Sequence, residues 1–237
     1  AIIEAAGVNL IAGVDIDKSK LDDFGERWGV HSLYTNVQEM VTKERPDIVC
    51  VTTGPSERHD VVVALAQAGV KAIFATKPIC QTLAQADEMI EVCRRNSTIL
   101  TMACHLNWYR PYTAARELIE RGDIGPLLSL VGNTRHSLSN IGSHTLALFR
   151  MFAGAPARWV FGHMDDNTAA SGNGDISGSG HVVYENGVQA FLNSRVPART
   201  WSLEFMCEKG RIISRNHHAT FELWTEETEA DGRDIRY

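Results

Sequence analysis

Apolar runs alternate with helix-like stretches along the amino-terminal part of this chain. Runs dense in valine, isoleucine, leucine and phenylalanine predict buried strands at residues 8–15, 31–34, 47–53, 70–77 and 98–102. Between these runs apolar residues recur at helical spacing, which predicts helices at residues 18–28, 37–43, 58–68 and 82–95. Strands that alternate with helices form βαβ units, so we expect an α/β fold with a Rossmann-like, doubly wound parallel sheet.

The pattern changes after Met102 to a succession of strands. These are predicted at residues 127–134, 158–164, 181–184, 188–194, 202–207, 211–214 and 220–224, with helices at 112–121 and 144–152. Asn186-Gly187 separates two of the strands and is a strong hairpin signal, so we expect a largely antiparallel sheet. We therefore expect a Rossmann-like domain at residues 1–103 and an α+β domain at residues 104–237.

The order of the first strands differs from that of a complete doubly wound unit. Such a unit begins with a strand and a glycine-rich turn, and only its next strand ends on an acid. Here the acid-terminated strand at residues 8–15 comes after only a short helical stretch at residues 1–7. Because a βαβ unit needs about 30 residues or more, we expect the sequence to be a fragment, incomplete at both ends, that lacks the first strand and the turn.

Composition narrows the classes of function. The 237 residues are 44% hydrophobic and carry a formal net charge of -6, which indicates a globular protein and argues against a nucleic-acid partner. The five cysteines show no C-x-x-C spacing, and His217-His218 lacks acidic or cysteine companions, so we expect no metal site. With no apolar run of membrane-spanning length, we expect a cytoplasmic protein without a membrane partner. The glycine-rich stretch at residues 171–180 is expected to be a loop.

Two residues are candidates for catalysis. Lys77 ends a predicted strand where open α/β sheets bind ligands, Pro78 holds it extended, and its ammonium can hydrogen-bond a substrate hydroxyl. His144 starts a predicted helix, a place that favours a neutral imidazole able to act as a base, and Asn140 can orient that ring or bind a hydroxyl. The alternatives are a solvated strand-end lysine and an ordinary structural histidine.

Four residues are candidates for lining a cofactor. Asp15 ends its strand where a carboxylate can accept both ribose hydroxyls of an adenosine and repel a 2′-phosphate, which favours NAD over NADP. Thr53, Pro55 and His59 follow the next strand, where the backbone can pass close to the cofactor. A helix-capping role for Asp15 and an exposed position for His59 remain the alternatives.

These residues resemble the glucose–fructose oxidoreductase, inositol dehydrogenase and MocA (Gfo/Idh/MocA) family. Thr76-Lys77-Pro78 is similar to its Glu-Lys-Pro signature, and Gly142-Ser143-His144 to its catalytic-histidine helix. Residues 47–59 and 116–125 resemble two further family segments, in the same order along the chain. The resemblance implies an NAD(P)-dependent dehydrogenase acting on a secondary alcohol of a sugar, inositol or related polyol. It also implies that Lys77 and His144 are the catalytic pair, and that Asp15, Thr53, Pro55, His59 and Lys77 contact the cofactor.

Three departures from the family pattern leave other functions open. Thr76 replaces the signature glutamate, Asn140 stands where many members carry an aspartate, and Ala147 replaces an acid common after the histidine. One alternative is a redox-neutral enzyme that uses tightly held NAD to process a glycoside. Another is a non-catalytic homologue that binds a sugar or a partner chain. An open antiparallel sheet also needs a cover, so we expect a homo-oligomer formed through the sheet.

Overall fold

The computed structural model divides the chain into two compact units, Ala1–Ala103 and Cys104–Tyr237. It describes residues 7–135, 138–164, 176–196, 200–225, 227–228 and 234–235. Residues 1–6 of the helix expected at residues 1–7 and residues 171–175 of the loop expected at residues 171–180 lie outside these ranges. Residues 178–180 of that expected loop instead belong to a strand.

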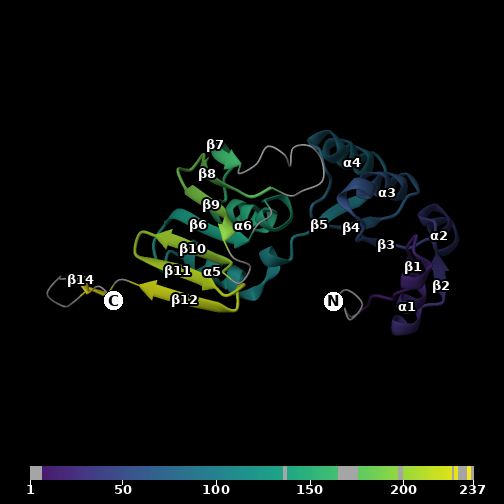
Figure 1. Cartoon of the computed structure of the whole chain (residues 1–237), viewed down its shortest axis with the longest axis horizontal. Helices are drawn as coiled ribbons and strands as arrows, with labels where there is room; N and C mark the ends of the chain where they lie inside the picture. Colours follow the sequence, from purple (N-terminus) through teal and green to yellow (C-terminus); the bar gives the residue numbers. More distant parts are fainter. Residues whose placement is uncertain are drawn as a thin grey trace. The chain divides into compact units, whose positions relative to one another are not determined.

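In its described part, residues 7–103, the first unit holds five parallel strands in two small sheets (Figure 1). One sheet pairs β1 (Ala12–Val14) with β2 (Ser32–Tyr34), and the other has the order β3 (Ile48–Val51), β4 (Ala72–Thr76), β5 (Ile99–Ala103). Every pairing is parallel, which confirms the expected Rossmann-like α/β fold. The first strand is shorter than expected, because within the described residues only Ala12–Val14 finds a ladder partner, and Val8 and Ile11 stay exposed.

Helices follow the strands of the first unit at the expected places. They are α1 (Lys18–Trp28), α2 (Val37–Glu44), α3 (Pro55–Gln67) and α4 (Leu83–Arg95). The Asp17 side chain caps α1 by accepting the Ser19 amide (3.0 Å), and Gly29 closes the helix in the left-handed region at φ 66°. α3 begins three residues earlier than predicted, because Pro55 suits the first helical position, where no backbone donor is needed.

Helices α3 and α4 lie side by side against β3, β4 and β5 (Figure 1). Their inward residues Val62, Leu65 and Met89 are at most 1% exposed, as is Ile73 from the central strand β4. Burying an aliphatic side chain of this size contributes about 1.5–3 kcal/mol. This core fixes the carboxyl ends of β3 and β4 relative to each other.

The second unit is built on a seven-stranded sheet with the order β12-β11-β10-β6-β9-β8-β7 (Figure 1). The strands are β6 (Leu127–Arg135), β7 (Ala157–Met164), β8 (Gly178–Tyr184), β9 (Gln189–Val196), β10 (Ser202–Cys207), β11 (Gly210–Arg215) and β12 (Thr220–Thr225). Among the pairings of the described strands in this sheet, only that of β6 with β9 is parallel, so the expected largely antiparallel sheet is confirmed. A small separate pair, β13 (Glu227–Thr228) and β14 (Asp234–Ile235), follows.

Helices cover one face of this sheet. The helical segments are a 3₁₀ turn at His105–Trp108, α5 (Arg110–Glu120), a π-helical turn at Leu138–Gly142 and α6 (Ser143–Ala153). Alternate strand residues such as Leu203 and Phe205 point into the core beneath the helices, and both are at most 1% exposed. The 3₁₀ turn and the π-helical turn were not predicted, because neither leaves a periodic signal in so few residues.

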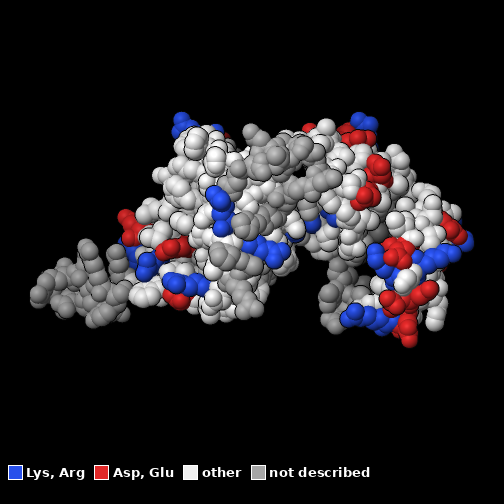
Figure 2. Space-filling model, in the orientation of Figure 1, with Lys and Arg blue, Asp and Glu red and all other residues white. Residues whose placement is uncertain are grey.

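Several charged side chains form opposite-sign pairs along the helices. Examples are Lys43 with Glu39 and Arg116 with Glu120, each at 2.7 Å and at helical i,i+4 spacing. On the face drawn in Figure 2, blue and red groups are interspersed. Among the described residues, no helix combines the length and apolar character needed to cross a membrane.

Candidate functional site

Lys77 is the first residue after β4, at the carboxyl edge of the three-stranded sheet. Its peptide bond to Pro78 is cis, and the lysine is half-buried. Proline ends the ladder here because it has no backbone donor. The sequence therefore places a half-buried amine at the sheet edge where ligands bind in open α/β folds.

Arg58 joins the Lys77 segment to the turn after β3, a role that no sequence pattern predicted. This helix α3 residue is only 2% exposed. Its guanidinium donates to the carbonyl oxygens of Thr53 and Pro78 and, at 2.9 Å, to the Thr76 hydroxyl. The single side chain thus binds residues on both sides of Lys77 and the turn that begins α3.

The three acceptors described for Arg58, two carbonyl oxygens and one hydroxyl, are all neutral. Burial lowers the pKa of Arg58, with Cys80 and Glu57 opposing that effect, and a buried cation is costly unless it is well hydrogen-bonded. Thr76, which stands where the family signature has glutamate, supplies one of the neutral acceptors. An arginine in a helix is normally exposed, so only the tertiary contacts identify Arg58 as a buried, structural residue.

Asp15 and Pro55 lie at the carboxyl ends of β1 and β3. Asp15 is half-buried and accepts the Asp17 amide at 2.9 Å, which shapes the turn into α1. Pro55 opens α3 directly after Gly54, which has no side chain to cap the helix. Pro55 has no backbone donor, and the Glu57 carboxylate lies against Gly54 and accepts a hydrogen bond from its own backbone amide, so this side chain already occupies the helix start.

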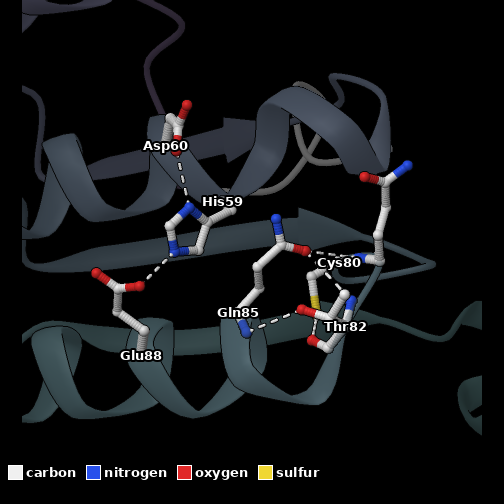
Figure 3. Close-up of polar contacts among 7 residues, drawn as sticks. His59, Asp60, Cys80, Thr82, Gln85 and Glu88 are labelled. Atoms are coloured by element: carbon white, nitrogen blue, oxygen red, sulfur yellow. Dashed lines mark hydrogen bonds and ion pairs between the residues drawn. The ribbon is translucent and has the colours of Figure 1, made fainter.

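His59 points from α3 toward α4, as Figure 3 shows. Its Nδ1 lies 2.8 Å from Asp60 Oδ1, and its Nε2 lies 3.0 Å from Glu88 Oε2. The Asp60 hydrogen bond raises the pKa of His59, burial opposes the rise, and the Glu88 bond adds to it. Both ring nitrogens of this predicted cofactor-lining residue are thus engaged by carboxylates.

We expect this arrangement to make stability depend on pH. A histidine whose pKa is raised on folding stabilises the protein below its unfolded value of about 6.5, and the gain is lost as pH rises through the folded pKa. His59→Gln should therefore lower the melting temperature more at about pH 5.5 than at about pH 8.5. Asp60→Asn should weaken the same dependence, and an equal effect of His59→Gln at both pH values would contradict the assignment.

In the second unit, His144 is the second residue of α6 and is 5% exposed. The π-helical turn Leu138–Gly142 leads directly into this helix and carries the exposed Asn140, whose carbonyl accepts the Ser143 hydroxyl at 3.0 Å. Helix α6 begins at Ser143, so His144 lies in its first turn as predicted, but Gly142 is itself in the right-handed helical region and the helical backbone of the π-helical turn precedes the histidine.

A glycine in the sheet allows α6 to lie close to β6. A Cβ added to Gly132 would come within 2.4 Å of Thr145 Cγ2 and 2.9 Å of Phe149 Cζ. Thr145 and Phe149 are fully buried, so neither has space to move away. The close approach fixes the first turn of α6, and with it the backbone of His144.

Aromatic rings surround His144. The His105 ring packs edge-on at 4.8 Å between centroids, and the Trp201 ring lies at 6.0 Å. Trp201 Nε1 also donates to the Thr145 hydroxyl at 3.2 Å, next to His144 in the chain. His105, near the start of the second unit, therefore packs against His144. Trp108 in the same 3₁₀ turn is 81% exposed.

The geometry groups the predicted residues within each unit. In the first unit, Arg58 holds Thr53 together with the segment around Lys77. Asp15 lies on the separate β1–β2 sheet, and His59 faces α4. In the second unit, Asn140 and His144 occupy consecutive helical turns.

Comparisons with known proteins identify relatives of this chain. A family model for oxidoreductases with an NAD-binding Rossmann fold, Gfo/Idh/MocA, matches residues 1–104. The chain is 28% identical over 211 residues to a D-apiose dehydrogenase from Paraburkholderia graminis, covering 81% of this chain and 55% of that protein. It is 25% identical over 242 residues to a myo-inositol 2-dehydrogenase from Thermotoga maritima, covering 92% of this chain and 71% of the relative.

Solved structures share the fold of both units. The WlbA dehydrogenase from Bordetella pertussis, solved with NADH and UDP-GlcNAcA, superposes with a TM-score of 0.82 at 16% identity, covering 94% of this chain and 75% of that one. At this identity the match establishes the architecture. The family model places the first unit, residues 1–104, in the Gfo/Idh/MocA family of oxidoreductases, and the two sequence relatives, whose matches extend over most of the chain, are dehydrogenases.

Proposed function

We propose that the protein is an NAD-dependent dehydrogenase that oxidises a secondary alcohol of a sugar, inositol or related polyol. The observation that carries the proposal is the half-buried lysine after β4, on a unit matched throughout by the family model. The buried histidine at the start of α6 supports it with a candidate base. The names of the relatives, D-apiose and myo-inositol dehydrogenases, support the substrate class.

The carboxyl edges of the parallel strands fit a nicotinamide dinucleotide. The Asp15 carboxylate follows β1, where such a group accepts ribose hydroxyls and disfavours a 2′-phosphate. The turn at Thr53 and Pro55 follows β3 and leads into α3, at the same sheet edge as Lys77. We therefore assign Asp15, Thr53, Pro55, His59 and Lys77 to the cofactor side of the site, with NAD preferred over NADP.

The chemistry divides between two residues. When bound, NAD supplies the acceptor for the hydride that leaves the alcohol carbon. Lys77 donates a hydrogen bond to the alcohol oxygen, which stabilises the charge that develops as its proton departs. His144 takes that proton on its imidazole, so the alcohol becomes a carbonyl. Asn140 binds a substrate hydroxyl or orients the imidazole, because its amide cannot itself accept the proton as a carboxylate can.

Calorimetric titration of the full gene product with NAD and NADP tests this function. We expect NAD to bind more tightly than NADP, and NADH to accumulate when a suitable polyol is added. Binding of NAD without net NADH would favour the redox-neutral alternative. Failure to bind either cofactor would overturn the dehydrogenase proposal in favour of a non-catalytic sugar- or partner-binding protein.

We also propose that a second copy of the chain covers the open face of the seven-stranded sheet. Cross-strand neighbours on this face include Phe161, His181 and Phe191, with the His181 and Phe191 rings stacked at 4.3 Å. Phe161 is 71% exposed and Phe191 40%, and exposed aromatic patches mark association surfaces.

Light scattering tests the proposed association. A mass above that of one chain should be found, and Phe161→Glu should reduce it. Leu83→Glu, at an exposed site on α4, is the control and should leave the mass unchanged. A single-chain mass for the unmodified protein would contradict the association.

We place the protein in the cytoplasm as a further part of the proposal. An odd number of cysteines without paired spacing suits a reducing compartment. Fractionation of the source cells, with the protein followed by antibody, tests the assignment.

A further inference from the structure

The turn between β11 and β12 adopts a strained backbone. Asn216, His217 and His218 have φ values of 53°, 55° and 68°, all in the left-handed region that favours glycine. Three consecutive non-glycine residues in this region are unfavourable unless the surroundings hold them in place. Such strain clusters at functional sites, so the contacts of residues 216–218 indicate which side chains the turn positions.

Hydrogen bonds from two other elements fix the His218 side chain. The ring is 6% exposed, and its Nδ1 is hydrogen-bonded to the Tyr112 hydroxyl from α5. That hydroxyl also lies 3.2 Å from Ser214 Oγ on β11, and both Tyr112 and Ser214 are fully buried. The Tyr109 hydroxyl contributes a longer bond, 3.4 Å, to the His218 carbonyl.

The held imidazole packs on Trp201. The two ring centroids are 4.3 Å apart at an interplanar angle of 73°, an edge-to-face arrangement. Among the described residues, His218 Nε2 is buried without a hydrogen-bond partner, so the bond at Nδ1 is the one that orients the ring. Burial, with smaller contributions from His217 and His105, lowers the pKa of His218 to about 4, which keeps the ring neutral.

Trp201 connects the strained segment at residues 216–218 to the amino-terminal end of α6. Its backbone carbonyl accepts the His217 amide at 3.3 Å, so the strained turn is tied to both its main chain and its ring. On the other side its indole Nε1 donates to the Thr145 hydroxyl at 3.2 Å, and its ring lies 6.0 Å from that of His144. The indole therefore lies between His218 and the histidine assigned as base.

We propose that His218 is a positioning residue that locks Trp201 against the first turn of α6 and thereby fixes the orientation of the His144 imidazole. The catalytic part of this inference rests on the proposed role of His144. The Tyr112 and Ser214 hydroxyls anchor His218, and the backbone strain is retained because it brings the ring onto Trp201. His218 itself is buried and does not contact substrate.

Two substitutions remove the hydrogen bond between Tyr112 and His218 while an aromatic ring remains at each position. His218→Phe keeps an aromatic ring and removes the bond to Tyr112, whereas Tyr112→Phe removes only the hydroxyl from the opposite side. Tyr109→Phe is the matched control, because it removes a hydroxyl that contacts the His218 carbonyl and not its ring. If His218→Phe fails to fold, Tyr112→Phe still tests the inference with one atom removed.

Nuclear magnetic resonance of the full gene product reads out the positions of the two rings without cofactor. The protein carries 5-fluorotryptophan, with the Trp201 signal assigned by Trp201→Phe, and labelled histidine, with His144 assigned by His144→Gln. We expect His218→Phe and Tyr112→Phe to move both the Trp201 and His144 signals, and Tyr109→Phe to leave them in place. Unmoved signals in both folded variants would overturn the inference.

Kinetics then test the consequence for turnover. We expect kcat to fall on the order of tenfold to a hundredfold in both variants, with the KM for NAD unchanged, because a slightly misplaced base is costly. An unchanged kcat in the folded variants would contradict the positioning role. If the signals move but the protein never forms NADH, the coupling of His218 to Trp201 and His144 is supported and the proposed dehydrogenase function is rejected.

Discussion

Replacing Lys77 by alanine should abolish turnover while leaving the affinity for NAD largely intact. The ammonium is proposed to stabilise the alcohol oxygen as its proton leaves, so it acts in the transition state and less in the ground state. Loss of such a group typically costs about 10²–10⁴-fold in rate. The backbone around it is held by Arg58 through Thr53 and Pro78, so truncating the side chain leaves the turn in place.

Lys71→Ala is the matched control for Lys77. Lys71 precedes the same strand, is 80% exposed and pairs with Asp47 at 2.6 Å, so it should affect neither kcat nor cofactor binding. The measurements are initial rates of NADH formation and calorimetric titration with NAD. Retained turnover in Lys77→Ala would remove the lysine from the mechanism.

Replacing His144 by glutamine should lower kcat by about 10²–10⁴-fold, because the amide cannot take up the alcohol proton. Glutamine keeps similar size and hydrogen-bonding capacity, which suits the buried position beside His105 and Trp201. NAD affinity should hold, since the assigned cofactor residues belong to the other unit. The loss should therefore appear in kcat more than in the KM for NAD.

His31→Gln serves as the control for His144, because His31 is exposed and lies just before β2. Its turnover and melting temperature should match those of the unmodified protein. Melting of His144→Gln establishes that the variant is folded before its rate is interpreted. A folded His144→Gln protein with normal turnover would show that another group accepts the proton.

Local patterns in the sequence predicted most of the fold. Helix α1 spans the predicted residues, between the cap residues Asp17 and Gly29, and Asn186-Gly187 joins two antiparallel strands. These features depend on neighbouring residues, so the sequence carries them directly. Strand ends were predicted less well, as at residues 8–11, because pairing depends on partners far along the chain.

The supporting residues of the site could not be predicted in the same way. Lys77 and His144 were identified because they occupy recognisable positions, a strand end and a helix start. Arg58 and His218 carry no such signal, since their significance lies in burial and in contacts with distant segments. Thr76 was noted only as a departure, and the structure shows that it accepts from Arg58.

The most direct test of the central claim is a double-variant comparison of Lys77→Met, His144→Gln and the two combined. Residues that act on one oxygen in one step are strongly non-additive. We therefore expect the combined variant to lose little more kcat/KM than the more severe single variant. Losses that multiply, or either single variant turning over normally, would contradict the claim that the two side chains act together on one substrate hydroxyl.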